Sequence, residues 1–108
     1  MIIKKALIGF SLLLMLTSCS INARIQKADK KFELGEYYSA GEMYRSIYPR
    51  IPTKKGKKQK AEVAFKMGNS YRLIESNKRA ESAYKNAIRF GYKDSMVYYY
   101  YAEVLKSN

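Results

Sequence analysis

Apolar residues recur at spacings of three and four along most of the chain, which is the period of one face of an α-helix. This pattern predicts five helices, at about 22–34, 37–48, 60–74, 77–90 and 95–107. Gly35 and Gly91 stand just past predicted helix ends, where glycine commonly closes a helix, and Pro49 ends the second helix. Helices of this length with short connections predict an all-α fold of antiparallel helical hairpins.

The first 19 residues follow a different pattern. Lys4 and Lys5 precede an apolar run from Ala6 to Leu16, and Leu-Thr-Ser-Cys occupies residues 16–19. A basic start, a short apolar centre and a small-residue exit are typical of a secretory signal. The apolar run is shorter than the roughly 20 residues that span a bilayer. We therefore predict that residues 1–18 are a cleavable signal peptide.

The exit of this segment resembles the lipobox of bacterial lipoproteins, which is Leu, two small residues and Cys. The resemblance implies that Cys19 becomes the first mature residue and is acylated, with residues 19–21 as lipid anchor and short tether. Several acyl chains anchor stably, because each buried methylene adds about 0.8 kcal/mol. In lipoproteins, Ser20 with no acidic cluster after it implies an outer-membrane, periplasm-facing anchor in the cell envelope. The alternative is an ordinary secretory leader with a chance Cys.

Internal repetition links the predicted helices. Gly68 and Ala102 lie 34 positions apart, whereas Ala40 and Tyr44 recur 40 positions later as Ala80 and Tyr84. The additional six residues fit in the Pro- and Lys-rich segment 49–60. Self-similarity at such periods is the signature of a helical solenoid.

Residues 61–94 resemble the tetratricopeptide repeat (TPR). The family has small residues where two helices approach closely and aromatic residues at fixed offsets from them, and the matching positions here are Gly68, Tyr71, Ala80, Tyr84 and Ala87. The chain departs from the family pattern at Ala64 and Tyr92, where TPRs have a large aromatic and a proline. The resemblance implies that residues 22–108 form a short TPR solenoid of about two and a half repeats. Other helix-pair solenoids remain an alternative.

Stacked TPR hairpins present a concave groove lined by their first helices. Carried over to this chain, the family's groove positions imply a partner groove of Glu62, Phe65, Asn69, Arg72, Met96, Tyr99, Glu103 and Lys106. Asn69 matches the backbone-binding Asn of TPRs that clamp peptide carboxylates, but Phe65 stands where those clamps need Lys. This departure argues against a carboxylate clamp. Asn69 and Phe65 can equally be a tolerated polar residue and a packing residue.

Charge and composition narrow the function. The formal net charge is +12, and residues 49–60 are expected to form a basic loop or a fraying helix start, with Lys54, Lys55, Lys57, Lys58 and Lys60. This loop either binds anionic headgroups or an acidic protein, or it is simply solvated. With no His and one Cys, the chain lacks a His general base, an intramolecular disulfide and a Cys/His metal site. We expect no enzyme activity, cofactor, metal or small-molecule substrate, and no nucleic-acid partner for an exported chain.

The last predicted helix carries four consecutive tyrosines, at 98–101. At least two of them must pack, because a run of four covers every side of a helix. A helix with large apolar residues on all sides is unlike a terminal cap, which has a polar outer face. We expect either that the natural chain continues past Asn108 or that this helix docks on a partner.

Residues 28–40, the loop of lysines and residues 65–72 together resemble the N-terminal region of OmpA-family lipoproteins associated with type IX secretion and gliding motility. In that group the TPR segment precedes a β-propeller and a peptidoglycan-binding domain, neither of which is present in these residues. The resemblance implies a non-enzymatic envelope scaffold that binds other envelope proteins. The alternative is a small lipoprotein whose basic loop binds a membrane surface or an anionic polymer.

Overall fold

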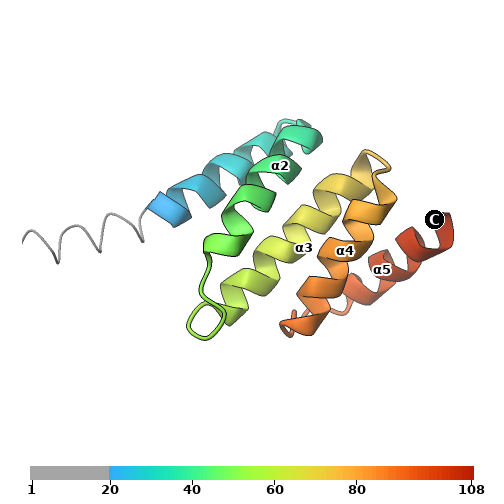
Figure 1. Cartoon of the computed structure of the whole chain (residues 1–108). Helices are drawn as coiled ribbons and strands as arrows, with labels where there is room; N and C mark the ends of the chain where they lie inside the picture. The colour runs from blue at the N-terminus through green and yellow to red at the C-terminus, as the bar shows by residue number, and fades with distance from the viewer. Residues whose placement is uncertain (1–19) are drawn as a thin grey trace, which may run out of the picture.

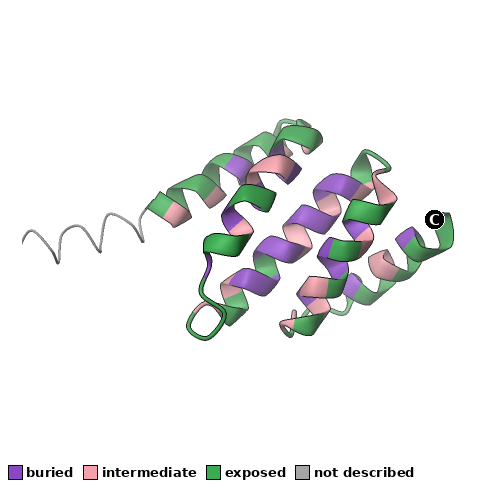
Figure 2. Cartoon of the chain, viewed as in Figure 1, coloured by how far each residue is buried: buried purple, intermediate pink, exposed green. Residues whose placement is uncertain are grey.

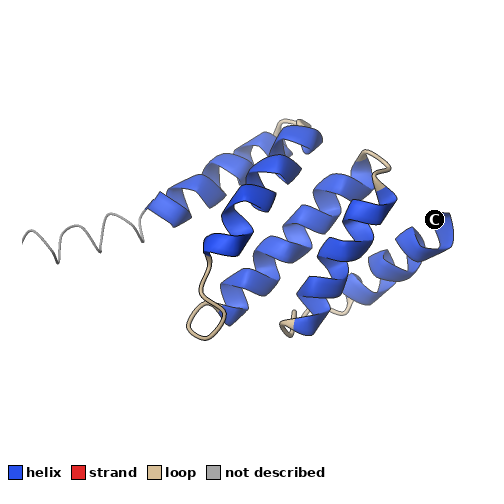
Figure 3. Cartoon of the chain, in the orientation of Figure 1, coloured by secondary structure: helices blue, strands red, loops and turns tan. Residues whose placement is uncertain are grey.

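A computed structural model of the chain describes residues 20–108, which are helical apart from short connections (Figures 1 and 3). The first helical segment covers residues 20–33. It is followed by α2 (Tyr37–Ile47), the 3-10 helix η1 (Tyr48–Arg50), α3 (Lys57–Leu73), α4 (Asn77–Arg89) and α5 (Met96–Ser107). Residues 20–108 contain no strand, so the all-α prediction is confirmed for them. The predicted signal peptide and Cys19 lie outside the described residues.

The helices form a row of antiparallel neighbours in chain order (Figure 1). Consecutive helices from α2 to α5 pack against one another, and segment 20–33 lies beside α2. Segment 20–33 also reaches α3, because the side chain of Gln59 donates a 2.9 Å hydrogen bond to that of Asn22. The first turn of segment 20–33 and the start of α3 therefore lie at the same edge of the helical layer, where these two helices begin.

Three of the turns between helices share one hydrogen-bonding pattern. After segment 20–33, the Gly35 N–H donates to the Phe32 carbonyl and the Glu36 N–H donates to the Lys31 carbonyl. The same pair of bonds recurs at residues 75–76 and 91–92. This is the Schellman motif, whose central residue has a positive φ. Gly35 and Gly91 meet that requirement without strain at φ 80° and 79°, whereas Glu75 adopts φ 59° as a non-glycine residue.

Buried positions gather on α3 and α4 in the middle of the row (Figure 2). The closest approach is at Gly68 on α3, where an added Cβ would lie 2.5 Å from the ring of Tyr84 on α4. The Tyr84 side chain is fully buried. Small residues thus allow the two helices to approach, and an aromatic ring fills the space that remains, as close packing in protein interiors requires.

We predict that Gly68→Ala destabilises the protein by about 1–3 kcal/mol, because the new methyl group overlaps the Tyr84 ring and overpacking has that cost. The overlap outweighs the roughly 1 kcal/mol that alanine gains over glycine inside a helix. Denaturant unfolding followed by circular dichroism measures the change.

Gly41→Ala is the matched control. Its new Cβ would lie 3.0 Å from the Tyr71 ring, an overlap that a small shift relieves. Its cost should therefore be smaller. Equal stability of the Gly68→Ala variant and the unmodified protein would contradict the packing described here.

Candidate partner groove

The five residues that match the TPR packing signature are all buried. Gly68 and Tyr71 lie on α3, and Ala80, Tyr84 and Ala87 lie on α4. These residues face neighbouring helices and not solvent, so they act as packing residues in this structure. They set the distance between α3 and its neighbours, and that distance shapes the surface beside them.

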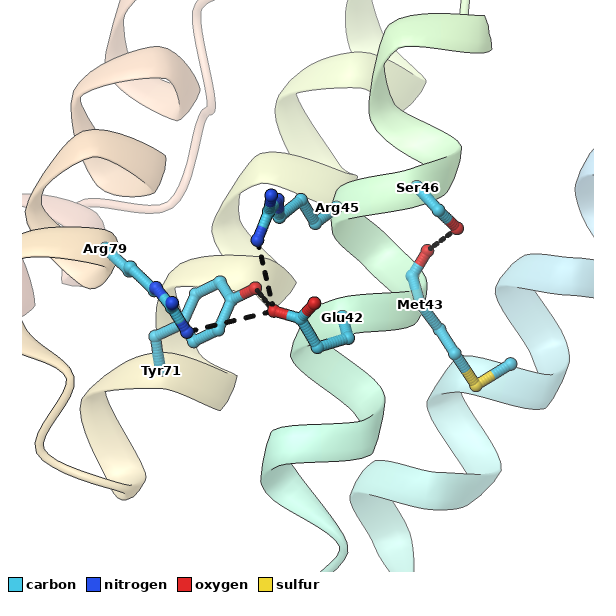
Figure 4. Close-up of polar contacts among 6 residues, drawn as sticks. All are labelled: Glu42, Met43, Arg45, Ser46, Tyr71 and Arg79. Carbon is cyan, nitrogen blue, oxygen red and sulfur yellow. Dashed lines mark hydrogen bonds and ion pairs between the residues drawn. The ribbon is translucent and has the colours of Figure 1, made fainter.

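Glu42 joins three helices (Figure 4). Its carboxylate, on α2, accepts a 2.7 Å hydrogen bond from the hydroxyl of Tyr71 on α3. Arg45 on α2 and Arg79 on α4 approach the same oxygen at 3.4 and 3.9 Å. Since both arginines are largely exposed, these ion pairs contribute little to stability compared with the packing beneath them.

A hollow of about 490 Å³ lies between segment 20–33, α2, α3 and the turn before α5. We call this hollow the groove, and its lining is Asp29, Phe32, Glu33, Tyr44, Glu62, Phe65, Lys66, Asn69 and Tyr92. Three of the predicted groove residues therefore line it, namely Glu62, Phe65 and Asn69. A volume of this size accommodates several side chains of a bound segment.

Phe65 lies in the aromatic part of the groove. Its ring stacks on Tyr92, with 4.2 Å between centroids and 19° between planes. Tyr84 and Tyr100 lie further along the same aromatic cluster, at 5.9 and 6.2 Å from the Phe65 centroid. Phe65 is half-buried, so it is both a packing residue and part of the groove surface.

A polar group that the sequence did not predict forms one wall of the groove. Lys66 donates to both carboxylate oxygens of Asp29, at 3.0 and 3.1 Å. The buried Tyr44 hydroxyl donates to the same carboxylate. Asp29 thus joins α2 and α3 to segment 20–33. Residues 29 and 66 are 37 positions apart, and only the three-dimensional stacking of the helices brings them together.

Asn69 and Arg72 hold the hydroxyl of Tyr84. This hydroxyl donates a 2.6 Å hydrogen bond to the side-chain oxygen Oδ1 of Asn69 and accepts a 2.9 Å hydrogen bond from Arg72 Nε. The Arg72 guanidinium also lies over the Tyr100 ring, 3.9 Å from its centroid. Arg72 does not line the hollow. Among the predicted groove positions, it is instead a residue that links α3 to α4 and α5.

The four groove positions predicted on α5 lie apart from the hollow. Met96, Tyr99, Glu103 and Lys106 are exposed, and none of them lines it. Tyr99 makes an edge contact with Tyr100. The hollow is therefore lined by three of the groove positions predicted on α3 and by none of those predicted on α5. In the tyrosine run, Tyr98 and Tyr99 are exposed and Tyr100 and Tyr101 pack against the core, which confirms that at least two are packing residues.

The basic segment 49–60 contains both a connection and a helix start, because α3 begins at Lys57. Only Lys54 and Lys55 lie in the connection, while Lys57 and Lys58 occupy the first turn of α3 and stay exposed. Lys60, the last of the five lysines, lies in the first turn of α3. It is buried, donates to the Ile51 carbonyl at 3.2 Å and lies over the Tyr48 ring, where its alkyl chain and charge are both accommodated.

Residues 20–108 contain no group of three or more His, Cys, Asp and Glu side chains that could hold a metal ion. No helix within that range is long and apolar enough to cross a membrane. No family model, curated protein or solved structure matches the chain.

Three tyrosine hydroxyls of the core have a higher pKa than the hydroxyl of a free tyrosine. Burial raises the pKa of Tyr71 and Tyr84 to about 12, and burial together with the bond to Asp29 raises the pKa of Tyr44. The unfolded chain ionises its tyrosines near pH 10. The folded state therefore keeps protons that the unfolded state loses, and the resulting stability is full below pH 10 and lost as the pH rises towards 12.

We predict that the free energy of unfolding falls above pH 10, by about 1.4 kcal/mol per pH unit for each of these tyrosines. Tyr44→Phe should reduce this slope by the contribution of one tyrosine, because the variant has one fewer proton to lose. Denaturant unfolding at a series of pH values from 8 upwards measures both. An unfolding free energy that does not change over this range would contradict the burial of these hydroxyls.

Proposed function

We propose that this chain is a non-enzymatic, lipid-anchored envelope scaffold whose TPR-like hairpins bind another protein in the groove. The observation that carries the proposal is the groove itself. Its lining combines a half-buried aromatic pair, Phe65 and Tyr92, with polar groups such as Glu62 and Asn69. Such a mixture of apolar surface and a few polar groups is typical of binding sites.

The polar groups of the groove favour binding over catalysis. Lys66 is held in an ion pair with Asp29, so its ammonium is poorly suited to act as a nucleophile. This pairing supports a role without enzyme activity.

The proposed anchor agrees with the position of the first helical segment. Asn22, three residues after the lipobox Cys19, contacts Gln59 on α3. An acyl group on Cys19 would then hold the edge of the domain where segment 20–33 and α3 begin close to the membrane. We further propose that the membrane is the outer membrane, that the domain faces the periplasm and that its partner belongs to an assembly such as the type IX secretion machinery.

A second candidate function rests on the positive charges near the start of α3. Lys57 and Lys58 lie beside Gln59, and with Lys93 they line another hollow, of about 550 Å³. Basic residues near an anionic membrane contribute about 1 kcal/mol each to binding. The second candidate is therefore a membrane-surface element that binds anionic lipid or polymer through these lysines.

The groove proposal predicts a position-specific protein contact. A photo-crosslinking phenylalanine derivative in place of Phe32, a half-buried residue of the groove lining, should give a discrete crosslinked protein in native cells. The same residue in place of Lys85, an exposed position on α4 outside the groove, is the matched control. Equal crosslinking from both positions, or none from either, would rule out the groove as the binding surface.

The anchor proposal predicts that Cys19→Ser abolishes acylation. Mass spectrometry of the purified protein should show loss of the lipid mass, and cell fractionation should show loss of membrane retention, because the acyl chains supply most of the membrane affinity. Ser20→Ala is the control and should remain acylated. A Cys19→Ser variant with unchanged mass and fractionation would refute the lipobox.

A further inference from the structure

The groove carries negative charge on a strongly positive protein. The chain has a formal net charge of +12, but three carboxylates and a single lysine line the groove. Lys66 is paired with Asp29. Among residues 20–108, no Lys or Arg lies within ion-pair distance of the other two carboxylates, Glu33 and Glu62. Both are exposed.

From this charge pattern we propose that the groove binds an arginine-bearing segment of a partner protein. The proposal rests on the protein-binding function above and names the chemistry of its ligand. A guanidinium fits because it can pair with two oxygens of one carboxylate and can also lie flat on an aromatic ring. The groove offers carboxylates at Glu33 and Glu62 and ring surface at Phe65 and Tyr92.

The chain already contains the contact that the proposal requires. Arg72 places its guanidinium 3.9 Å from the centroid of the Tyr100 ring, beside the same aromatic cluster. A cation over an aromatic face is attracted by the negative charge density of the ring. A ligand arginine over Phe65 or Tyr92 would repeat this contact with a carboxylate nearby.

Asn69 supplies a way to hold the backbone of such a segment. Its side-chain oxygen accepts a hydrogen bond from the Tyr84 hydroxyl, and this bond fixes the side-chain amide in place. Because Asn69 lines the groove, its amide nitrogen can donate to a peptide carbonyl of a bound segment. A carboxylate-bearing ligand is disfavoured, because it would face Glu33 and Glu62 while the groove's lysine is occupied by Asp29.

The overall positive charge of the protein does not prevent this binding. At physiological ionic strength charges are screened beyond about 8 Å. A ligand in the groove therefore interacts mainly with the carboxylates that line it. Lys57, Lys58 and Lys93 line a hollow that shares Glu62 and Tyr92 with the groove, so these three lysines reduce the attraction that Glu62 exerts on an arginine. More distant lysines affect the association rate more than the bound state.

The test uses the full-length chain in non-ionic detergent and a blocked, fluorescent Gly-Arg-Gly-Arg-Gly peptide. Two peptides of the same length serve as comparisons, one with citrulline in place of arginine and one with glutamate. Citrulline keeps the shape of the side chain and removes its charge. We expect the arginine peptide to bind at least about tenfold more tightly than either, since charge-assisted hydrogen bonds are the stronger ones.

The protein variants test the residues. Glu33→Gln with Glu62→Gln should weaken binding of the arginine peptide about tenfold or more, because both carboxylates are removed without a change of shape. The control, Glu75→Gln with Glu81→Gln, makes the same charge change outside the groove and should leave binding unchanged. Thermal unfolding should show that both variants stay folded.

Two results would overturn the inference: equal binding of the arginine and citrulline peptides, or unchanged binding by the groove variant. The first would leave the proposed function standing if crosslinking from position 32 still captures a protein. That combination would show a groove that binds a partner of different chemistry. Absence of crosslinking from position 32 would instead reject the protein-binding function itself.

Discussion

The contact between the Gly68 backbone and the Tyr84 ring is the constraint on which the rest of the structure depends. It brings α3 and α4 together, and the Tyr84 hydroxyl then reaches Asn69 and Arg72 on α3. Through Arg72 the same network extends to Tyr100 on α5. One ring therefore fixes the relative positions of three helices.

The groove is a consequence of this packing. Asn69 on α3 is held by the core network, and Phe65, one helical turn earlier, stacks on Tyr92 in the turn before α5. On the other side, Asp29 is held by Tyr44 and Lys66. A binding surface that rests on buried contacts loses less conformational freedom when a ligand binds, which favours affinity. This preorganisation is the structural basis of the proposed scaffold role.

The sequence predicted best what depends on local spacing. Helical periodicity gave the helices to within a few residues, and the repeat pattern identified Gly68, Tyr71 and Tyr84 as packing positions that the structure buries. Glycine signals also located two of the turns. The third turn has Glu75 at a positive φ, and its sequence lacks the glycine that marks the other two.

Other features could not be predicted because they depend on long-range geometry. The pairing of Asp29 with Lys66 requires the stacking of segment 20–33 on α3. Lys60 resembled its neighbouring lysines in sequence, but the exact start of α3 turned it towards Ile51 and Tyr48. Arg72 occupies a groove position by repeat alignment, yet the hydroxyl of Tyr84 and the ring of Tyr100 draw it into an internal contact.

The most direct test of the central claim is a double-mutant cycle between Gly68→Ala and Tyr84→Leu, measured by denaturant unfolding. If the Tyr84 ring lies against the Gly68 backbone, removal of the ring makes room for the new methyl group. Gly68→Ala should then cost at least about 1 kcal/mol less in the Tyr84→Leu background than in the unmodified protein. Additive effects of the two substitutions would show that the ring does not set the approach of α3 and α4, and would contradict the account.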